Sequence, residues 1–239
     1  MNHIQFFTYA NADTIEEMIY KMKPGKLKVI NKTTTLNIVI LRDLDIDLEP
    51  FIQKIINIKD VLKWTKSSPL GAITSHSKPA FLECLLNAGG DPNYIIDGER
   101  SLLFHLFVRS ENDYNKRLIE ILLDHGADPN ISYHHHDWCN NVLGKALWLH
   151  NNDRFYIVKR FLEAGADPNI YCRPGIRPLD LCFNRISDLK ITFLILQYDG
   201  TMYHDRLQTF LGLNVFIICD LMLYGPNTDW IQEIKGYIY

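Results

Sequence analysis

The chain has 239 residues, of which 47% are hydrophobic and 22% are charged. This composition is typical of a protein that folds around an apolar core and not of a disordered chain. The formal net charge is only -3, so the chain lacks the basic excess that nucleic-acid binding requires. Its longest apolar stretch, residues 211–224, contains Asn214 and Asp220 and is shorter than the roughly 20 residues of a transmembrane helix, so we expect no membrane crossing.

The cysteine content and the N-terminal segment predict a cytoplasmic protein. The five cysteines are an odd number and form no Cys-x-x-Cys pair, which indicates neither a disulfide framework nor a redox motif. Residues 1–13 lack the basic start and the apolar core of a secretion signal, so we expect the mature chain to begin at Met1. No Walker loop, Gly-x-Gly-x-x-Gly or His-Glu-x-x-His motif occurs, and we expect no cofactor.

A short block recurs three times in the middle of the chain, with glycine, aspartate, proline and asparagine at matching positions. The copies read LLNAGGDPN at 85–93, LLDHGADPN at 122–130 and FLEAGADPN at 161–169. Successive aspartates are 37 and 39 residues apart, a spacing typical of repeat proteins. The paired apolar residues predict the end of an amphipathic helix, and Gly89, Gly126 or Gly165 predicts a left-handed residue that ends it. Asp-Pro-Asn then predicts a turn into an extended hairpin.

These blocks resemble the second half of an ankyrin repeat, whose first half carries a Thr-Pro-Leu-His-like motif about 23 residues before the aspartate. Segments similar to that motif begin near this spacing at Ser68 and Arg177, and with a few extra residues in the turn between the helices at Ser101 and Asn141. On these residues the chain is identified as a member of the ankyrin-repeat family. The resemblance implies an all-α ankyrin-repeat solenoid of stacked helix-turn-helix pairs with hairpin loops, with about five to six repeats plus capping helices.

The resemblance also implies how the chain is divided. It is strong over residues 67–202 and weaker on both sides, as expected for capping repeats whose outer faces meet water. Pro50 falls in the first turn of a helix predicted within residues 50–58. The predicted regions are 1–66 for divergent N-terminal repeats or a cap, 67–99, 100–139, 140–175 and 176–202 for four ankyrin repeats, and 203–239 for C-terminal capping helices and a tail.

The function implied by the resemblance is that of a monomeric scaffold or adaptor, not an enzyme, that binds a protein partner. In the family, the partner usually meets the hairpin tips and the exposed face of the first helix of each repeat. Tryptophan and arginine at such positions are typical of binding hot spots. A competing interpretation places Trp138 and Trp148 in the core. The predicted partner-binding positions include Trp64, His76, Arg100, Arg109, Trp138, Trp148, Leu149, Arg173 and Arg185.

The residue usage of the chain suggests where such a partner is found. The chain contains 28 Ile and 18 Asn but only 9 Ala. This bias resembles proteins of AT-rich genomes, among them ankyrin proteins of large DNA viruses and intracellular bacteria that capture host proteins in the host cytoplasm. We therefore expect the partner to be a host protein.

A second hypothesis is a metal- or cysteine-dependent enzyme built on the predicted hairpins 131–141 and 171–176. Histidine and cysteine are ligands of zinc and copper, but consecutive histidines alone are weak evidence. No orienting group or oxyanion motif accompanies the cysteines, so we expect neither a metal site nor a catalytic site. The residues of this hypothesis are His134, His136, Cys139 and Cys172.

Two kinds of polar residue in the repeats are expected to serve structure. His105 stands one position after the family's histidine and is predicted to satisfy nearby backbone. The last residue of each block, Asn93, Asn130 or Asn169, is predicted to brace the hairpin through a hydrogen bond. The same asparagine position is hydroxylated in some ankyrin proteins of animal cells, which is the alternative role for it.

Overall fold

The computed structural model describes residues 10–21, 39–40, 42, 46–53, 68–96, 98–108, 116–132, 141–149, 153–172, 175–182 and 189–200. These residues are mostly helical, in agreement with the predicted all-α class. The chain forms two compact units, Met1–His134 and His135–Tyr239. No helix of the described residues is both long and apolar enough to cross a membrane. The predicted C-terminal region 203–239 lies outside the described residues.

The first unit begins with two helices, α2 (Ala12–Lys21) and α4 (Leu48–Gln53), which pack against each other. The Asn11 side chain caps α2 by accepting a hydrogen bond from the amide three residues on, at 2.9 Å. Asp47 caps α4 by accepting from the amide two residues on, also at 2.9 Å. As predicted, Pro50 lies in the first turn of its helix, where a missing amide costs no intrahelical hydrogen bond.

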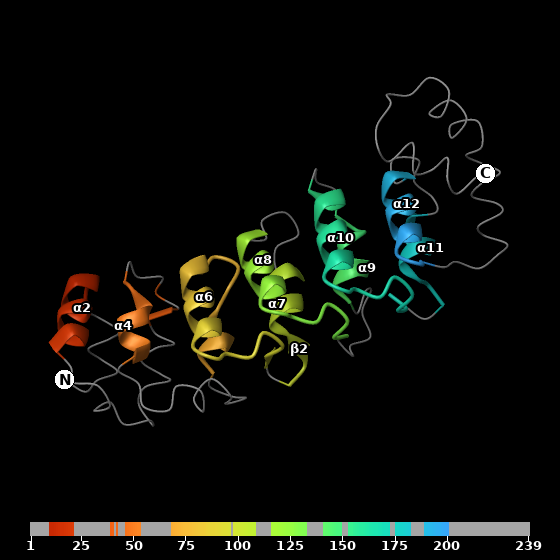
Figure 1. Cartoon of the computed structure of the whole chain (residues 1–239). Coiled ribbons are helices and arrows are strands. Elements are labelled where there is room, and N and C mark those ends of the chain that lie inside the picture. Colours follow the sequence, from red (N-terminus) through yellow and green to blue (C-terminus); the bar gives the residue numbers. More distant parts are fainter. Residues whose placement is uncertain are drawn as a thin grey trace, which may run out of the picture. The chain divides into compact units, whose positions relative to one another are not determined.

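Beyond α4, the described chain is organised as pairs in which a short helix is followed by a longer one (Figure 1). The pairs of the first unit are the 3-10 helix η2 (Pro69–Ala72) with α6 (Pro79–Asn87), and α7 (Leu102–Val108) with α8 (Lys116–Asp124). Those of the second unit are α9 (Val142–Ala146) with α10 (Arg154–Glu163), and α11 (Pro178–Cys182) with α12 (Leu189–Gln197). The members of each pair are in contact, as are the long helices α6 and α8, and α10 and α12.

Each short helix begins directly after a position that the resemblance predicts. The side chains of three of these residues accept a hydrogen bond from an amide of the first turn, namely Ser68, Ser101 and Asn141. Before α11 the direction is reversed, because the Arg177 amide donates to the Asp180 carboxylate at 2.9 Å. Both arrangements satisfy backbone amides that have no partner within the helix.

Apolar residues at helical spacing form the core of each unit. On α8 of the first unit, Leu118, Ile119 and Leu122 are buried at separations of three and four residues. On α10 of the second unit, Ile157 and Phe161 repeat that spacing. Burial of one such side chain stabilises the fold by about 1.5–3 kcal/mol. Packing therefore holds helices that are too short to be stable alone.

The long helices end in one recurring corner, which the repeated block predicts. Gly89, Gly126 and Gly165 have φ angles of +98°, +83° and +88°, the left-handed conformation that ends a helix. In each corner the glycine amide donates to the carbonyl three residues before it, and the next amide donates to the carbonyl five residues before it. At Gly165 and Ala166 both distances are 2.9 Å. The predicted helix-ending role of these glycines is confirmed.

A fourth corner of the same kind ends α12, although its sequence LQYDG departs from the block. Asp199 takes the place of the glycine, with a φ angle of +60°. Its amide donates to the Leu196 carbonyl at 3.0 Å, and the Gly200 amide donates to the Ile195 carbonyl at 2.9 Å. Aspartate adopts the left-handed conformation more readily than most residues with a Cβ, but it still costs up to about 1–2 kcal/mol relative to glycine, so Asp199 retains some strain.

The aspartate of each block closes a turn directly after the corner. The Oδ1 atoms of Asp91, Asp128 and Asp167 each accept a hydrogen bond from the asparagine amide two residues on, at 2.8 Å in every case. Proline lies between the two residues and cannot extend the helix. The chain therefore leaves each corner along the same local path.

Asn93 and Asn169 link one corner to a later one. Asn93 Oδ1 accepts a hydrogen bond from the Asp128 amide at 2.7 Å, and Asn169 Nδ2 donates to the Asp199 carbonyl at 2.9 Å. The sequence predicted that these side chains brace only their own hairpin. They also join segments that are 35 and 30 residues apart in the chain.

The hairpin predicted after the first block is present. Strand β1 (Ile95–Ile96) pairs antiparallel with β2 (Arg100–Ser101), with Ile96 opposite Arg100. Gly98 lies in the connecting turn with a φ angle of +74°. Residues 133–140 of the hairpin predicted after the second block lie outside the described residues.

We expect Asp199→Gly to raise the free energy of unfolding by about 1 kcal/mol, because glycine adopts a left-handed conformation without a Cβ contact. Gly165→Ala should lower it by about 1–2 kcal/mol. A Cβ at Gly165 would meet no atom within 4 Å, so this cost arises from the backbone alone. Urea denaturation followed by circular dichroism measures both changes. An unchanged stability of Asp199→Gly would contradict the strained corner.

Candidate partner-binding surface

Four of the predicted partner-binding residues lie in the described part of the chain. His76 lies in the turn between η2 and α6, and Arg100 lies in β2, both in the first unit. Trp148 and Leu149 are the second and third residues after α9 in the second unit. The others lie outside the described residues and stay predictions: Trp64, Arg109, Trp138, Arg173 and Arg185.

The turn that carries His76 is closed by short-range hydrogen bonds. The Thr74 amide donates to Ser77 Oγ at 2.9 Å, and the Ser77 amide donates back to the Thr74 carbonyl at 3.0 Å. His76 is exposed between them, with its Nδ1 3.3 Å from Ser75 Oγ. A preformed turn loses little backbone freedom when a partner binds, so His76 suits a contact of the predicted kind.

Arg100 is half-buried on a hairpin that is fixed at its base. Tyr94 is buried just before β1, and its carbonyl accepts a hydrogen bond from the Leu102 amide at 2.8 Å, where α7 begins. The Tyr94 hydroxyl stands 3.3 Å from the place that a Cβ on Gly71 would occupy, so the ring packs against η2. The hairpin thus holds Arg100 at a defined place relative to the first two helix pairs.

Trp148 and Leu149 differ in burial although they are neighbours. Trp148 is 37% exposed, whereas Leu149 is 5% exposed. Their amides donate to the Lys145 and Ala146 carbonyls at 3.0 and 3.1 Å, so they continue a tight 3-10-type turn in which neighbours point about 120° apart. The prediction that Leu149 faces a partner is wrong, because its side chain belongs to the core. Trp148 is partly exposed, as the partner-binding interpretation requires, and its contact with a partner stays a prediction.

Cys172, from the alternative enzyme hypothesis, is fully buried in the second unit. Its Sγ atom fills the space beside Gly144, where any Cβ would clash with it. A buried cysteine in apolar surroundings is typically inert and structural. In the described ranges, no group of three or more His, Cys, Asp or Glu is placed to hold a metal ion. His134, His136 and Cys139 lie outside those ranges.

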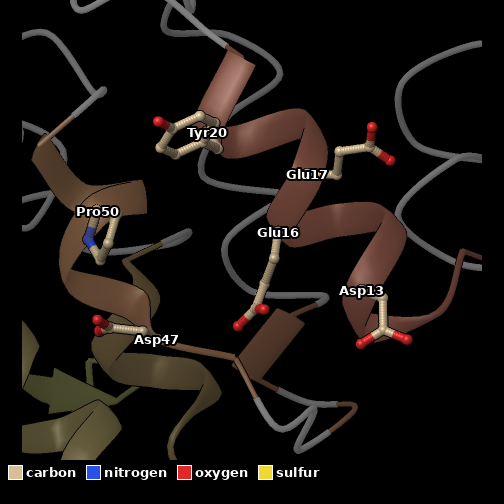
Figure 2. Close-up of a pocket in the computed structure, with 6 residues that line it drawn as sticks. All are labelled: Asp13, Glu16, Glu17, Tyr20, Asp47 and Pro50. Carbon is tan, nitrogen blue, oxygen red and sulfur yellow. The ribbon is translucent and has the colours of Figure 1, made fainter.

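A groove between α2 and α4 was not predicted from the sequence. It has a volume of about 410 Å³ and is called the α2–α4 groove below. Figure 2 shows Glu16 and Tyr20 on the side of α2 that faces Asp47 and Pro50. Tyr20 is 87% exposed, far more than the other large apolar residues described. The lining residues are Asp13, Glu16, Glu17, Tyr20, Asp47 and Pro50.

Negative charge continues from the groove toward α6. Burial raises the pKa of the Cys84 thiol on α6, and the neighbouring carboxylates of Glu49, Asp47 and Glu83 raise this pKa further. Carboxylates act in this direction because negative charges oppose formation of the thiolate. Asp47 therefore belongs both to the lining of the groove and to an acidic surface that extends to the next helix.

Comparison with known proteins adds no family assignment. The chain matches no protein-family model, and it matches no curated protein. The candidate binding surface is therefore described by its own side chains, on the turns, the hairpin and the groove.

Alkylation of Cys84 should be slow near neutral pH and should rise with pH at higher values than for an ordinary cysteine, because a raised pKa leaves less thiolate. Replacing Asp47 with Asn and Glu49 with Gln should lower the pKa and move the profile to lower pH. Iodoacetamide labelling followed by peptide mass spectrometry measures the rates. Glu163→Gln on α10 serves as the charge control. A double variant with the wild-type profile would contradict the acidic surface.

Proposed function

We propose that the chain is an ankyrin-repeat protein that binds a protein partner through its turns, hairpins and short first helices. The recurring corner supports the family, since three blocks and the divergent Asp199 sequence share the left-handed residue and the two helix-ending hydrogen bonds. The alternation of a short capped helix with a longer one also supports it. Repeats of this kind bury their cores against neighbours and leave one face for binding.

The exposure of Trp148 is the observation that carries the binding function. Its neighbour Leu149 packs into the core, whereas the indole of Trp148 lies partly in water at the end of a first helix. Tryptophan gains more than other residues from being covered at an interface, because it combines a large apolar surface with a hydrogen-bond donor. We propose His76 on its closed turn and Arg100 on its hairpin as polar contacts with the partner in the first unit.

The enzyme hypothesis has weaker support. Cys172 is fully buried against Gly144, which is typical of a thiol that serves packing. The three remaining residues of that hypothesis, His134, His136 and Cys139, fall on a segment outside the described residues. We therefore propose protein binding without a catalytic step.

Trp148→Ala should weaken the binding of a protein partner by about tenfold or more, as expected for a buried hot-spot tryptophan. The partner is captured with the tagged full-length chain, identified by mass spectrometry and purified, and its Kd is then measured by calorimetry. Tyr198→Ala is the matched control, because Tyr198 is also 37% exposed but lies at the end of α12, away from the predicted positions.

Two outcomes would contradict this assignment, provided that circular dichroism shows both variants to be folded. An unchanged Kd for Trp148→Ala would remove Trp148 from the binding surface. Equal losses for Trp148→Ala and Tyr198→Ala would show that exposed aromatic residues in general, and not the predicted positions, carry the binding.

A further inference from the structure

The α2–α4 groove has features of a docking surface that the hairpin positions do not include. It lies between two packed helices of the first unit, and one of its walls is the ring of Tyr20. That ring is 87% exposed. Covering an apolar ring with another molecule removes its surface from water and lowers the free energy of the system. The groove therefore offers an uncovered apolar surface to an occupant.

The charges around the ring define the chemistry of the occupant. Four of the lining residues are carboxylates, and the described lining residues include no lysine or arginine. Arg42 stands at the start of α2, where its guanidinium donates to the Ala10 carbonyl at 2.9 Å. The acidic surface continues through Asp47 toward Glu49 and Glu83. A complementary occupant is cationic and extends over more than one positive charge.

The arrangement of Glu16 and Tyr20 favours arginine over lysine. These residues are four apart on α2, so they are neighbours on one helix face, and Figure 2 shows that this face is turned toward Asp47. A guanidinium group can stack on a tyrosine ring and also donate two parallel hydrogen bonds to a carboxylate. A lysine ammonium group is a point charge and cannot make both contacts with the same geometry.

We propose that the α2–α4 groove binds an arginine-containing segment of a protein partner, with a guanidinium group between Tyr20, Glu16 and Asp47. This proposal rests on the proposed protein-binding function and adds a second contact surface in the first unit. The volume of about 410 Å³ suits a peptide segment and exceeds what a single ion occupies. The occupant is therefore a segment of polypeptide rather than a metal ion.

The test measures the affinity of the full-length chain for a fluorescein-labelled peptide of alternating arginine and glycine, by fluorescence anisotropy. Replacing Glu16 with Gln and Asp47 with Asn should weaken binding about five- to tenfold, because each lost pair is exposed and modest in strength. Tyr20→Ala should weaken it about threefold, whereas Tyr20→Phe should keep the wild-type affinity because the ring remains. Raising the salt concentration should weaken binding of the wild-type chain.

The control variant carries Asp124→Asn and Glu163→Gln, which remove the same charge from exposed positions on α8 and α10. It should bind the arginine peptide like the wild type. Equal losses in the control and in the groove variant would overturn the proposal, because the peptide would then respond only to net charge. The proposal would also be overturned if a lysine-glycine peptide bound with equal affinity. The same holds if spermine, at an equal concentration of positive charge, displaced the arginine peptide.

Failure of this proposal can be told apart from failure of the proposed function. Trp148→Ala should leave the affinity for the arginine peptide unchanged, because Trp148 belongs to the second unit and not to the groove. A groove variant that loses the peptide while Trp148→Ala keeps the protein partner supports the groove and contradicts only the Trp148 surface. The reverse result contradicts only the groove.

Discussion

A left-handed residue at the end of each long helix is the constraint on which the described structure depends. It turns the chain out of the helix while its own amide and the next one satisfy two carbonyls that would lack partners. The aspartate turn that follows gives the three block corners the same exit path, and Asn93 ties its corner to the one at Asp128. Turns and first helices therefore follow each corner at similar distances along the chain, and the count of the proposed partner-facing positions relies on this.

The corners and the starts of the short helices could be predicted because their interactions are local. Gly126 and the aspartate after it act within a few residues of the helix end, and Ser68 or Asn141 caps its own helix. The corner at Asp199 departs from the glycine rule, since an aspartate there has a positive φ angle. The hydrogen bond from the Asp128 amide to Asn93 spans 35 residues, and no local pattern in the sequence indicates it.

Less of the candidate site could be predicted than of the fold. Counting from Asn141 located Trp148 and Leu149, but it could not show that the two side chains point in different directions. The α2–α4 groove was missed because it depends on the packing of two helices that are separated in the sequence. The carboxylates and Tyr20 of α2 have helical spacing, which was the available signal. Asp47 joins them only through the tertiary contact between α2 and α4.

The equivalence of the four corners is tested most directly by amide hydrogen exchange, resolved residue by residue by NMR. The amides of Gly90, Ala127, Ala166 and Gly200 each donate to the carbonyl five residues before them. All four should exchange as slowly as amides in the middle of their helices, including Gly200 in the divergent sequence. Exchange of these amides at the rate of an unstructured peptide would contradict the recurring corner and, with it, the counting that assigns the partner-binding positions.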